Sequence, residues 1–273
     1  MDQVTTGHLE DGRVIAQEQL GNDYQRLVVE VPGVAAAAQP GQFVHLRVPG
    51  LDSRVLRRPF SVYRVKGSEL VLLYKTVGAG TRAMNALRAG DTLSVMGPLG
   101  RGFPLAAKGF PVLIGGGYGA APLSFLAEKL PRKGVVFLGG RTAADVLCRE
   151  DFKKLGWEIQ VATEDGSLGL KGFVTAALDA WLEAEGGLAP APELYACGPD
   201  GMLKALAERA AARGLTAWLS MDRHMGCGAG VCLACVIRVK RVNGSGEETW
   251  ARVCKEGPVF ESREIVWHGG TAK

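Results

Sequence analysis

The sequence predicts a β + α/β fold in three consecutive parts. A six-stranded antiparallel barrel is expected over residues 1–104, a parallel-sheet α/β domain over 105–219, and a small cysteine-rich module over 220–273. Three observations support this division: short strands fill the first hundred residues, strands and helices then alternate strictly, and four of the six cysteines follow Ser220. A length of 273 residues accommodates two domains and such an appendage.

The first part contains six short segments rich in Val, Leu, Phe and Tyr, and Gly, Pro, Asn or Asp separates most of them. A series of this kind is typical of a small antiparallel barrel. The expected strands are 14–19, 24–31, 42–48, 58–65, 70–77 and 92–96, with one short helix at 81–88.

The second part alternates apolar strands with helical segments, which indicates a parallel sheet with crossover helices. The expected strands are 111–114, 135–138, 158–162, 193–196 and 216–219. The expected helices are 121–130, 143–155, 174–185 and 202–213. No regular element is predicted after Ser220.

Composition excludes several classes of protein. Apolar residues make up 47% and charged residues 22%, which is globular and neither disordered nor fibrous. A net charge of +4 is too small to indicate a nucleic-acid partner. The apolar runs are too short for a membrane span and no secretory signal precedes them, so we expect a cytoplasmic protein without a membrane partner. Clustered cysteines in that compartment favour metal ligands or redox groups over disulfides.

Four cysteines, Cys227, Cys232, Cys235 and Cys254, follow the pattern C-x4-C-x2-C-x18-C. This spacing matches the plant-type ferredoxin pattern of a [2Fe–2S] cluster. Glycines alternate with the first two cysteines, and they let backbone N–H groups approach inorganic sulfides closely.

A structural zinc site is the alternative for the same four thiols, although zinc sites usually contain two close pairs and this pattern has one. Buried free thiols are the third possibility. The remaining Cys148 lies in a predicted helix and is expected to be a small buried hydrophobe.

Three segments of the barrel indicate a flavin dinucleotide. Arg58-Pro59-Phe60-Ser61 lies on a predicted strand, Leu73-Tyr74-Lys75 on the next, and Gly78-Ala79-Gly80-Thr81 opens a helix. An arginine for a pyrophosphate, an aromatic beside a ring system and a Gly-rich helix start together describe an FAD site. Taken alone, the first segment would fit an edge strand that carries a proline better than a cofactor site.

Two loops indicate a nicotinamide cofactor. Gly115-Gly116-Gly117-Tyr118-Gly119 and Cys197-Gly198-Pro199 each follow a strand and precede a helix, so both are expected at one crevice of the parallel sheet. A tight strand–helix turn is the alternative for the first loop. Arg141 is the only basic residue near the end of the second strand, which favours NAD over NADP.

These segments resemble the ferredoxin–NADP reductase superfamily, which carries R-x-[YFP]-[ST], G-x-[GS]-[ST] and C-G-P motifs. The resemblance implies that Arg58, Gly80 and Thr81 hold the FAD pyrophosphate and that Ser61 approaches the isoalloxazine. It also implies that Cys197-Gly198-Pro199 lies next to the nicotinamide.

Within that superfamily the chain is similar to the electron-transfer subunits of dihydroorotate dehydrogenase B. The similarity rests on the domain order and on residues 57–61, 225–235 and 252–260. It implies one FAD, one [2Fe–2S] cluster, NAD, and an FMN-containing catalytic subunit in a heterotetramer of two plus two. Electrons would pass from dihydroorotate to NAD in pyrimidine biosynthesis, and this chain would have no catalytic acid or base of its own.

The FAD subunit of bifurcating NADH-dependent ferredoxin–NADP oxidoreductase shares this domain order but has an Asp among its cluster ligands. Four cysteines here favour the dihydroorotate system. A stand-alone NAD(P)H–ferredoxin reductase and a zinc-stabilised binding module remain as alternatives. Tyr118 and Ala120-Ala121 depart from the family's aliphatic pattern, and this affects the expected nicotinamide pose rather than the fold.

Overall fold

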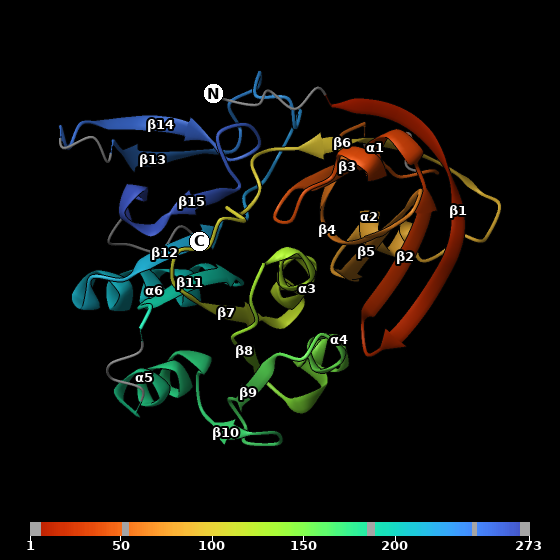
Figure 1. Ribbon diagram of the computed structural model, residues 1–273. Helices are drawn as coiled ribbons and strands as arrows, with labels where there is room; N and C mark the ends of the chain where they lie inside the picture. Colours follow the sequence, from red (N-terminus) through yellow and green to blue (C-terminus); the bar gives the residue numbers. More distant parts are fainter. Residues whose placement is uncertain (1–6, 51–54, 185–188, 242–244, 268–273) are drawn as a thin grey trace.

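A computed structural model describes residues 7–50, 55–184, 189–241 and 245–267 of the chain. It shows a closed barrel packed against a seven-stranded sheet, with a small hairpin beside the sheet (Figure 1). No helix in these described ranges is long and apolar enough to cross a membrane.

The barrel is confirmed as six antiparallel strands in the order β1-β2-β5-β4-β3-β6. Its core is formed by inward-facing aliphatic side chains such as Leu27, Val44 and Leu72, none of which is exposed. The short helix α1, which was not predicted, follows β2. The elements are β1 His8–Gly21, β2 Tyr24–Glu30, α1 Pro32–Ala37, β3 Phe43–Arg47, β4 Arg58–Lys66, β5 Glu69–Lys75, α2 Ala79–Met84 and β6 Thr92–Leu99.

The second sheet has the order β10-β9-β8-β7-β11-β12-β15, and all neighbouring strands pair in parallel except β12 and β15 (Val259–Glu261), which are antiparallel. Two of its central strands, β7 and β8, carry no polar side chain, as is usual where helices cover both faces of a parallel sheet. The strands are β7 Phe110–Gly116, β8 Val135–Gly140, β9 Glu158–Thr163, β10 Leu170–Lys171, β11 Pro192–Cys197 and β12 Thr216–Ser220. The helices are α3 Ala120–Lys129, α4 Arg149–Lys154, α5 Val174–Ala184 and α6 Asp200–Arg213.

One predicted helix is wrong in its extent. The segment 143–155 divides into a 3-10 turn at Ala143–Asp145 and helix α4, because Cys148 adopts the left-handed conformation with φ of 60°. A single continuous helix cannot pass through that conformation. The predicted last residue of the helix at 174–185 lies outside the described residues.

The absence of regular structure predicted after Ser220 is also wrong. β13 Val236–Lys240 and β14 Glu248–Arg252 form an antiparallel hairpin, and β15 Val259–Glu261 pairs with β12. The cysteine-rich segment is therefore attached to the edge of the second sheet. The division at residues 104 and 219 stays a prediction.

Helix α3 joins the two main parts, and it lies between the barrel and the second sheet in Figure 1. Phe125 packs into the barrel core, whereas Leu123 and Leu126 pack against the second sheet. Two apolar faces explain why nearly the whole helix is buried. At its end, Arg64 of β4 forms an ion pair of 2.6 Å with Glu128.

Candidate cofactor sites

The predicted flavin residues meet where β4 begins. Arg58, Pro59, Phe60 and Ser61 are all half-buried, whereas the next two residues of the strand are buried. A Cβ on Gly80 would lie 3.0 Å from Nε of Arg58, so the guanidinium lies over the first turn of α2. The Arg58 side chain donates to the carbonyls of Leu56 and Arg57 and has no carboxylate partner within the described part of the chain. A fixed cation therefore faces a glycine turn, as a pyrophosphate site requires.

Thr81 contributes to this turn in another way. Its Oγ1 accepts hydrogen bonds from the backbone N–H groups of Val77 at 2.9 Å and Gly78 at 3.0 Å, and it donates to the Gly78 carbonyl at 3.1 Å. These three bonds use the hydroxyl fully. Thr81 therefore shapes the turn beneath Arg58.

The remaining predicted flavin residues, Leu73, Tyr74 and Lys75, lie at the end of β5 and differ in their surroundings. Leu73 and Tyr74 are buried, and the Tyr74 ring packs edge-on against Phe60 with 5.6 Å between ring centroids. Burial raises the pKa of Tyr74 to about 12, so its hydroxyl stays protonated and donates to Asn85 Oδ1 at 3.0 Å. Tyr74 therefore packs against Phe60 from the side of the barrel core.

The side chain of Lys75 contacts Asp145 and Tyr24. Its Nζ lies 3.6 Å from Asp145 Oδ1 and 4.9 Å from the centroid of the Tyr24 ring. Tyr24 donates a hydrogen bond of 2.8 Å to the same carboxylate oxygen. This polar contact connects the barrel to the turn after β8, and nothing in the sequence pattern indicated Tyr24 or Asp145.

The Asp145 carboxylate is stabilised in this contact. Burial alone would raise its pKa, but the Tyr24 hydrogen bond and the positive charges of Lys75 and Arg141 outweigh that effect and lower the pKa below its ordinary value. A Cβ on Gly117 would lie 3.9 Å from the Tyr24 hydroxyl. The contact therefore borders the glycine loop that follows β7.

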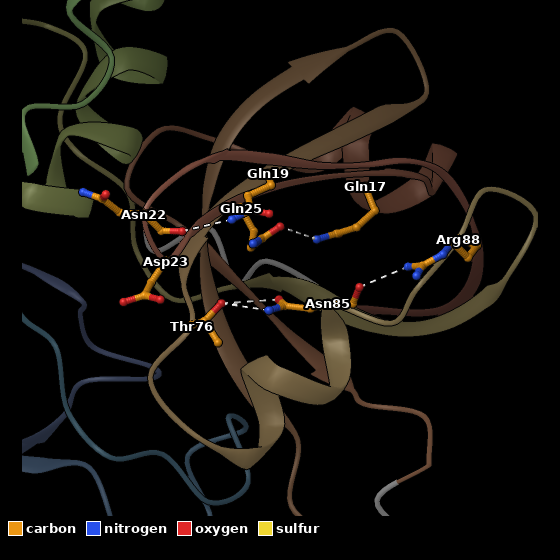
Figure 2. A pocket seen from close by; sticks show the side chains of 8 residues that line it. All are labelled: Gln17, Gln19, Asn22, Asp23, Gln25, Thr76, Asn85 and Arg88. Carbon is orange, nitrogen blue, oxygen red and sulfur yellow. Dashed lines mark hydrogen bonds between the residues drawn. The ribbon is translucent and has the colours of Figure 1, made fainter. Parts of the chain in front are cut away.

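A polar pocket lies elsewhere on the barrel, and Figure 2 shows it between β1, β2 and the end of α2. None of the predicted cofactor residues lines it, so we assign it no cofactor. Its lining residues are Gln17, Gln19, Asn22, Asp23, Gln25, Thr76, Asn85 and Arg88.

The two predicted nicotinamide loops are in direct contact, because β7 and β11 are parallel neighbours. A Cβ on Gly198 would lie 3.1 Å from Cα of Gly116, and a Cβ on Gly119 would lie 2.2 Å from the carbonyl oxygen of Cys197. Only glycine permits this approach. Burial raises the pKa of Cys197 to about 12, so its thiol stays neutral beside the loop.

The first two cysteines of the cluster pattern form one pair. The backbone N–H of Cys227 lies 3.4 Å from Sγ of Cys232, and the N–H of Cys232 lies 3.5 Å from Sγ of Cys227. Ala229 and Val231 also direct their N–H groups at Cys227 Sγ. Burial raises the Cys227 pKa, but these backbone donors outweigh it and lower the pKa to about 6.

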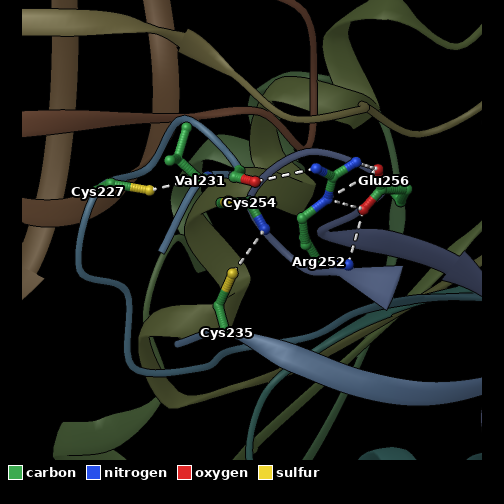
Figure 3. A network of polar contacts seen from close by, with 7 residues as sticks. Cys227, Val231, Cys235, Arg252, Cys254 and Glu256 are labelled. Atoms are coloured by element: carbon green, nitrogen blue, oxygen red, sulfur yellow. Dashed lines mark hydrogen bonds and ion pairs between the residues drawn. The ribbon is translucent and has the colours of Figure 1, made fainter. Parts of the chain in front are cut away.

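The other two cysteines form a second, buried pair, in which the N–H of Cys254 lies 3.4 Å from Sγ of Cys235. Arg252 connects the two pairs: its Nη1 donates to the Gly230 carbonyl at 2.9 Å, and Glu256 accepts from its backbone N–H at 2.7 Å (Figure 3). Burial, followed by the neighbouring Cys235, raises the pKa of Cys254 to about 12.

Four thiols and several converging N–H donors form the set that iron–sulfur ligation uses. Within the residues described here, however, no three His, Cys, Asp or Glu side chains gather closely enough to hold a metal ion. The cysteines are therefore grouped in two pairs, and their joint role as ligands stays a prediction.

Comparison with family models covers nearly the whole chain. Residues 11–103 match an oxidoreductase FAD-binding domain and residues 113–208 match an oxidoreductase NAD-binding domain. Residues 222–266 match the iron–sulfur cluster binding domain of dihydroorotate dehydrogenase B. The three matches follow the order that the sequence predicted.

Curated relatives are similar along their full length. The electron transfer subunit of dihydroorotate dehydrogenase B (NAD(+)) from Desulforamulus reducens is 36% identical over 94% of this chain and 98% of its own. The subunit of the same name from Bacillus caldolyticus is 40% identical over 93% of this chain and 100% of its own.

Solved structures agree with the fold. A structure of the NADH-dependent reduced ferredoxin–NADP oxidoreductase superposes with a TM-score of 0.81 at 30% identity, covering 94% of this chain and 90% of the other. The cytochrome P450 reductase GcoB from Amycolatopsis superposes with a TM-score of 0.61 at 28% identity, covering 76% of this chain and 67% of the other.

Proposed function

The chain belongs to the family of electron-transfer subunits of NAD-dependent dihydroorotate dehydrogenase B. From this we propose which of its residues bind FAD, NAD and the iron–sulfur cluster. It is an oxidoreductase subunit of pyrimidine biosynthesis with FAD-binding, NAD-binding and iron–sulfur binding domains. The position of Arg58 over the Gly80 turn is the observation that best supports the residue assignments.

In this proposal Arg58 binds the FAD pyrophosphate above the turn that Thr81 shapes. The half-buried edge of Pro59, Phe60 and Ser61 then faces the isoalloxazine, and Tyr74 supports Phe60 from the barrel side. Leu73 packs in a buried cluster with Val71 and with Ala121 of α3. Lys75 lies 3.6 Å from Asp145, and in this proposal it also helps to hold the second domain against the barrel.

The nicotinamide end of the site is formed by two loops. Gly115, Gly116 and Gly117 leave room for the NAD pyrophosphate at the start of α3, and Cys197, Gly198 and Pro199 border the nicotinamide. Their direct contact supports the assignment, because both loops then line one crevice at the ends of parallel strands.

Cys227, Cys232, Cys235 and Cys254 would hold the [2Fe–2S] cluster. Backbone N–H groups around Cys227 favour its thiolate, which is the form that ligates iron. When bound, FAD exchanges electron pairs with the nicotinamide and single electrons with the cluster, which is the conversion that the activity needs.

We also propose that residues 227–235, here called the cysteine loop, face the catalytic partner. This partner would be an FMN-containing subunit in a heterotetramer of two plus two. Cys232 is exposed, and the apolar side chains on either side of it, Val231 and Leu233, are 81% and 58% exposed. Exposed aliphatic side chains beside a redox group are typical of a surface that another protein covers.

All six cysteines are free, which supports a cytoplasmic location.

The cluster assignment can be tested with Cys232→Ser, purified anaerobically. We expect this variant to lose the visible absorption of the cluster but to keep FAD and NADH-driven flavin reduction. A variant that retains its iron and loses its flavin would contradict the assignment.

The flavin assignment can be tested with Arg58→Ala, for which we expect a clearly lower ratio of FAD to protein after gel filtration. Arg26→Ala is the matched control, because that barrel arginine pairs with Glu18 on the surface. Equal flavin content in both variants would contradict the role of Arg58.

A further inference from the structure

His45 connects strand β4, which carries the predicted flavin residues 58–61, with the cysteine loop. It is on β3, where its register partner on β4 is Pro59. Its side chain is fully buried. A Cβ on Gly228, the residue after Cys227, would lie 2.8 Å from both Nδ1 and Cε1 of the imidazole. The ring edge therefore rests directly on the loop that carries the first two cysteines.

Neither nitrogen of this ring has a hydrogen-bond partner among the described residues. Buried polar atoms in folded proteins nearly always have partners, and an unpaired donor costs free energy. Phe43 packs against one side of the ring, with 5.6 Å between ring centroids, and offers no acceptor. The Gly228 contact shows that the cysteine loop lies against another side of the ring.

The protein groups around the imidazole favour its neutral form. Burial, and then the nearby positive charge of Arg57, lower the pKa of His45 to about 4. Arg57 itself is occupied, because its guanidinium donates to the Ser94 carbonyl at 3.0 Å and to Ser94 Oγ at 3.1 Å. An imidazole carries at least one N–H donor whether it is neutral or charged.

We propose that His45 donates this N–H to a sulfur of the iron–sulfur cluster at Cys227 and Cys232. The inference rests on the proposed cluster site. Gly228 permits the contact because it has φ of +69° and no side chain. His45 is then paired with β4 through its backbone and with the cysteine loop through its side chain.

The expected consequence is a higher cluster potential. Reduction adds one negative charge to the cluster, and a hydrogen bond to its sulfur stabilises that charge. Removing the donor should change the equilibrium constant for reduction about tenfold, which is about 59 mV for one electron.

The test uses the complete chain with its cofactors. His45→Phe keeps a ring of similar shape and removes both nitrogens, whereas His45→Gln keeps an N–H donor. We expect the midpoint potential, followed by EPR during redox titration, to fall in the Phe variant and to recover partly in the Gln variant. His224→Gln is the matched control, since it removes an exposed imidazole near the same loop and should leave the potential unchanged.

A second measurement applies even if the Phe variant fails to fold. Pulsed EPR of protein labelled with 15N-histidine should show a nitrogen coupling to the reduced cluster, both in the wild type and in His224→Gln. If the wild type contains its cluster but shows no such coupling, the role of His45 is overturned. The same holds if His45→Phe has the midpoint potential of the wild type. Neither result would affect the proposed cluster site. Absence of iron from the wild type would instead overturn the proposed cluster site.

Discussion

Two cations that the sequence placed together, Arg58 and Lys75, have different environments. Arg58 has no carboxylate partner in the described structure and lies on the Gly80 turn, whereas Lys75 lies near Asp145. The residue type could not separate these roles, because Asp145 comes from a turn some seventy positions later. At the residue scale, long-range partners decide which charge remains available for a ligand.

Asp145→Asn tests the contact between the domains. The pKa of Asp145 is lowered in the folded protein, so its contribution to stability is present above the unfolded pKa of about 3.9 and is lost as the pH falls through the folded value. We expect the variant to lose about 1 kcal/mol of unfolding free energy at pH 7, and less in acid.

Urea unfolding at pH 7 and at pH 3 measures this difference. Glu18→Gln is the control, because its pair with Arg26 is largely exposed and should change stability by less than about 0.5 kcal/mol. A loss for Asp145→Asn that is equally large at both pH values would contradict the ionic role of the carboxylate.

At the element scale, the two nicotinamide loops depend on close backbone approach. Gly119→Ala would place a methyl group 2.2 Å from the Cys197 carbonyl oxygen, so the loops must separate. We expect at least a tenfold loss in the rate of NADH-driven flavin reduction in stopped-flow experiments, with unchanged FAD content.

Gly201→Ala is the control, because a Cβ there meets nothing within 4 Å. The same rate of flavin reduction in Gly119→Ala and Gly201→Ala would show that the loop contact is not needed for NAD.

Arg252 is the second test at this scale, because it connects the two cysteine pairs through Gly230. We expect Arg252→Met to lose iron to a chelator about tenfold faster than the wild type, because the contacts that hold the two cysteine-bearing segments together are lost. Arg238→Met is the control, since that arginine pairs with Glu248 within the same hairpin. Equal rates of iron loss would contradict the role of Arg252.

The sequence was most informative where its pattern was regular. All six barrel strands and five strands of the second sheet were found, because they are apolar segments bounded by turn residues. β10 was missed because it has only two residues, and β13, β14 and β15 were missed because they are short and lie among cysteines and glycines. Cys148 broke a predicted helix through a left-handed conformation that propensity does not reveal.

The site was predictable to the same extent. Local motifs identified Arg58, the two glycine loops and the cysteine spacing. His45, Tyr24 and Asp145 carried no motif, because their positions follow from contacts between elements far apart in the sequence. Such contacts become visible only in the folded chain.

At the scale of the whole molecule, β15 attaches the cysteine segment to the second sheet, and His45 places it against the barrel. The three parts therefore meet around one region, and the exposed side of the cysteine loop remains for a partner. Val231→Asp should weaken binding of the catalytic subunit at least tenfold, because it buries a charge in an apolar contact.

Analytical ultracentrifugation of the two subunits measures this binding. Leu170→Asp is the control, since Leu170 is 56% exposed on β10, at the opposite edge of the sheet from β15. Equal binding by the two variants would move the partner surface away from the cysteine loop.

We propose that this chain carries electrons between a catalytic partner and NAD through its own FAD and cluster. The most direct measurement is a metal and flavin inventory of the complex, co-expressed with the partner and purified anaerobically. We predict about two Fe and one FAD per copy of this chain, and one FMN per copy of the partner. Zinc in place of iron, or a chain without FAD, would contradict the account.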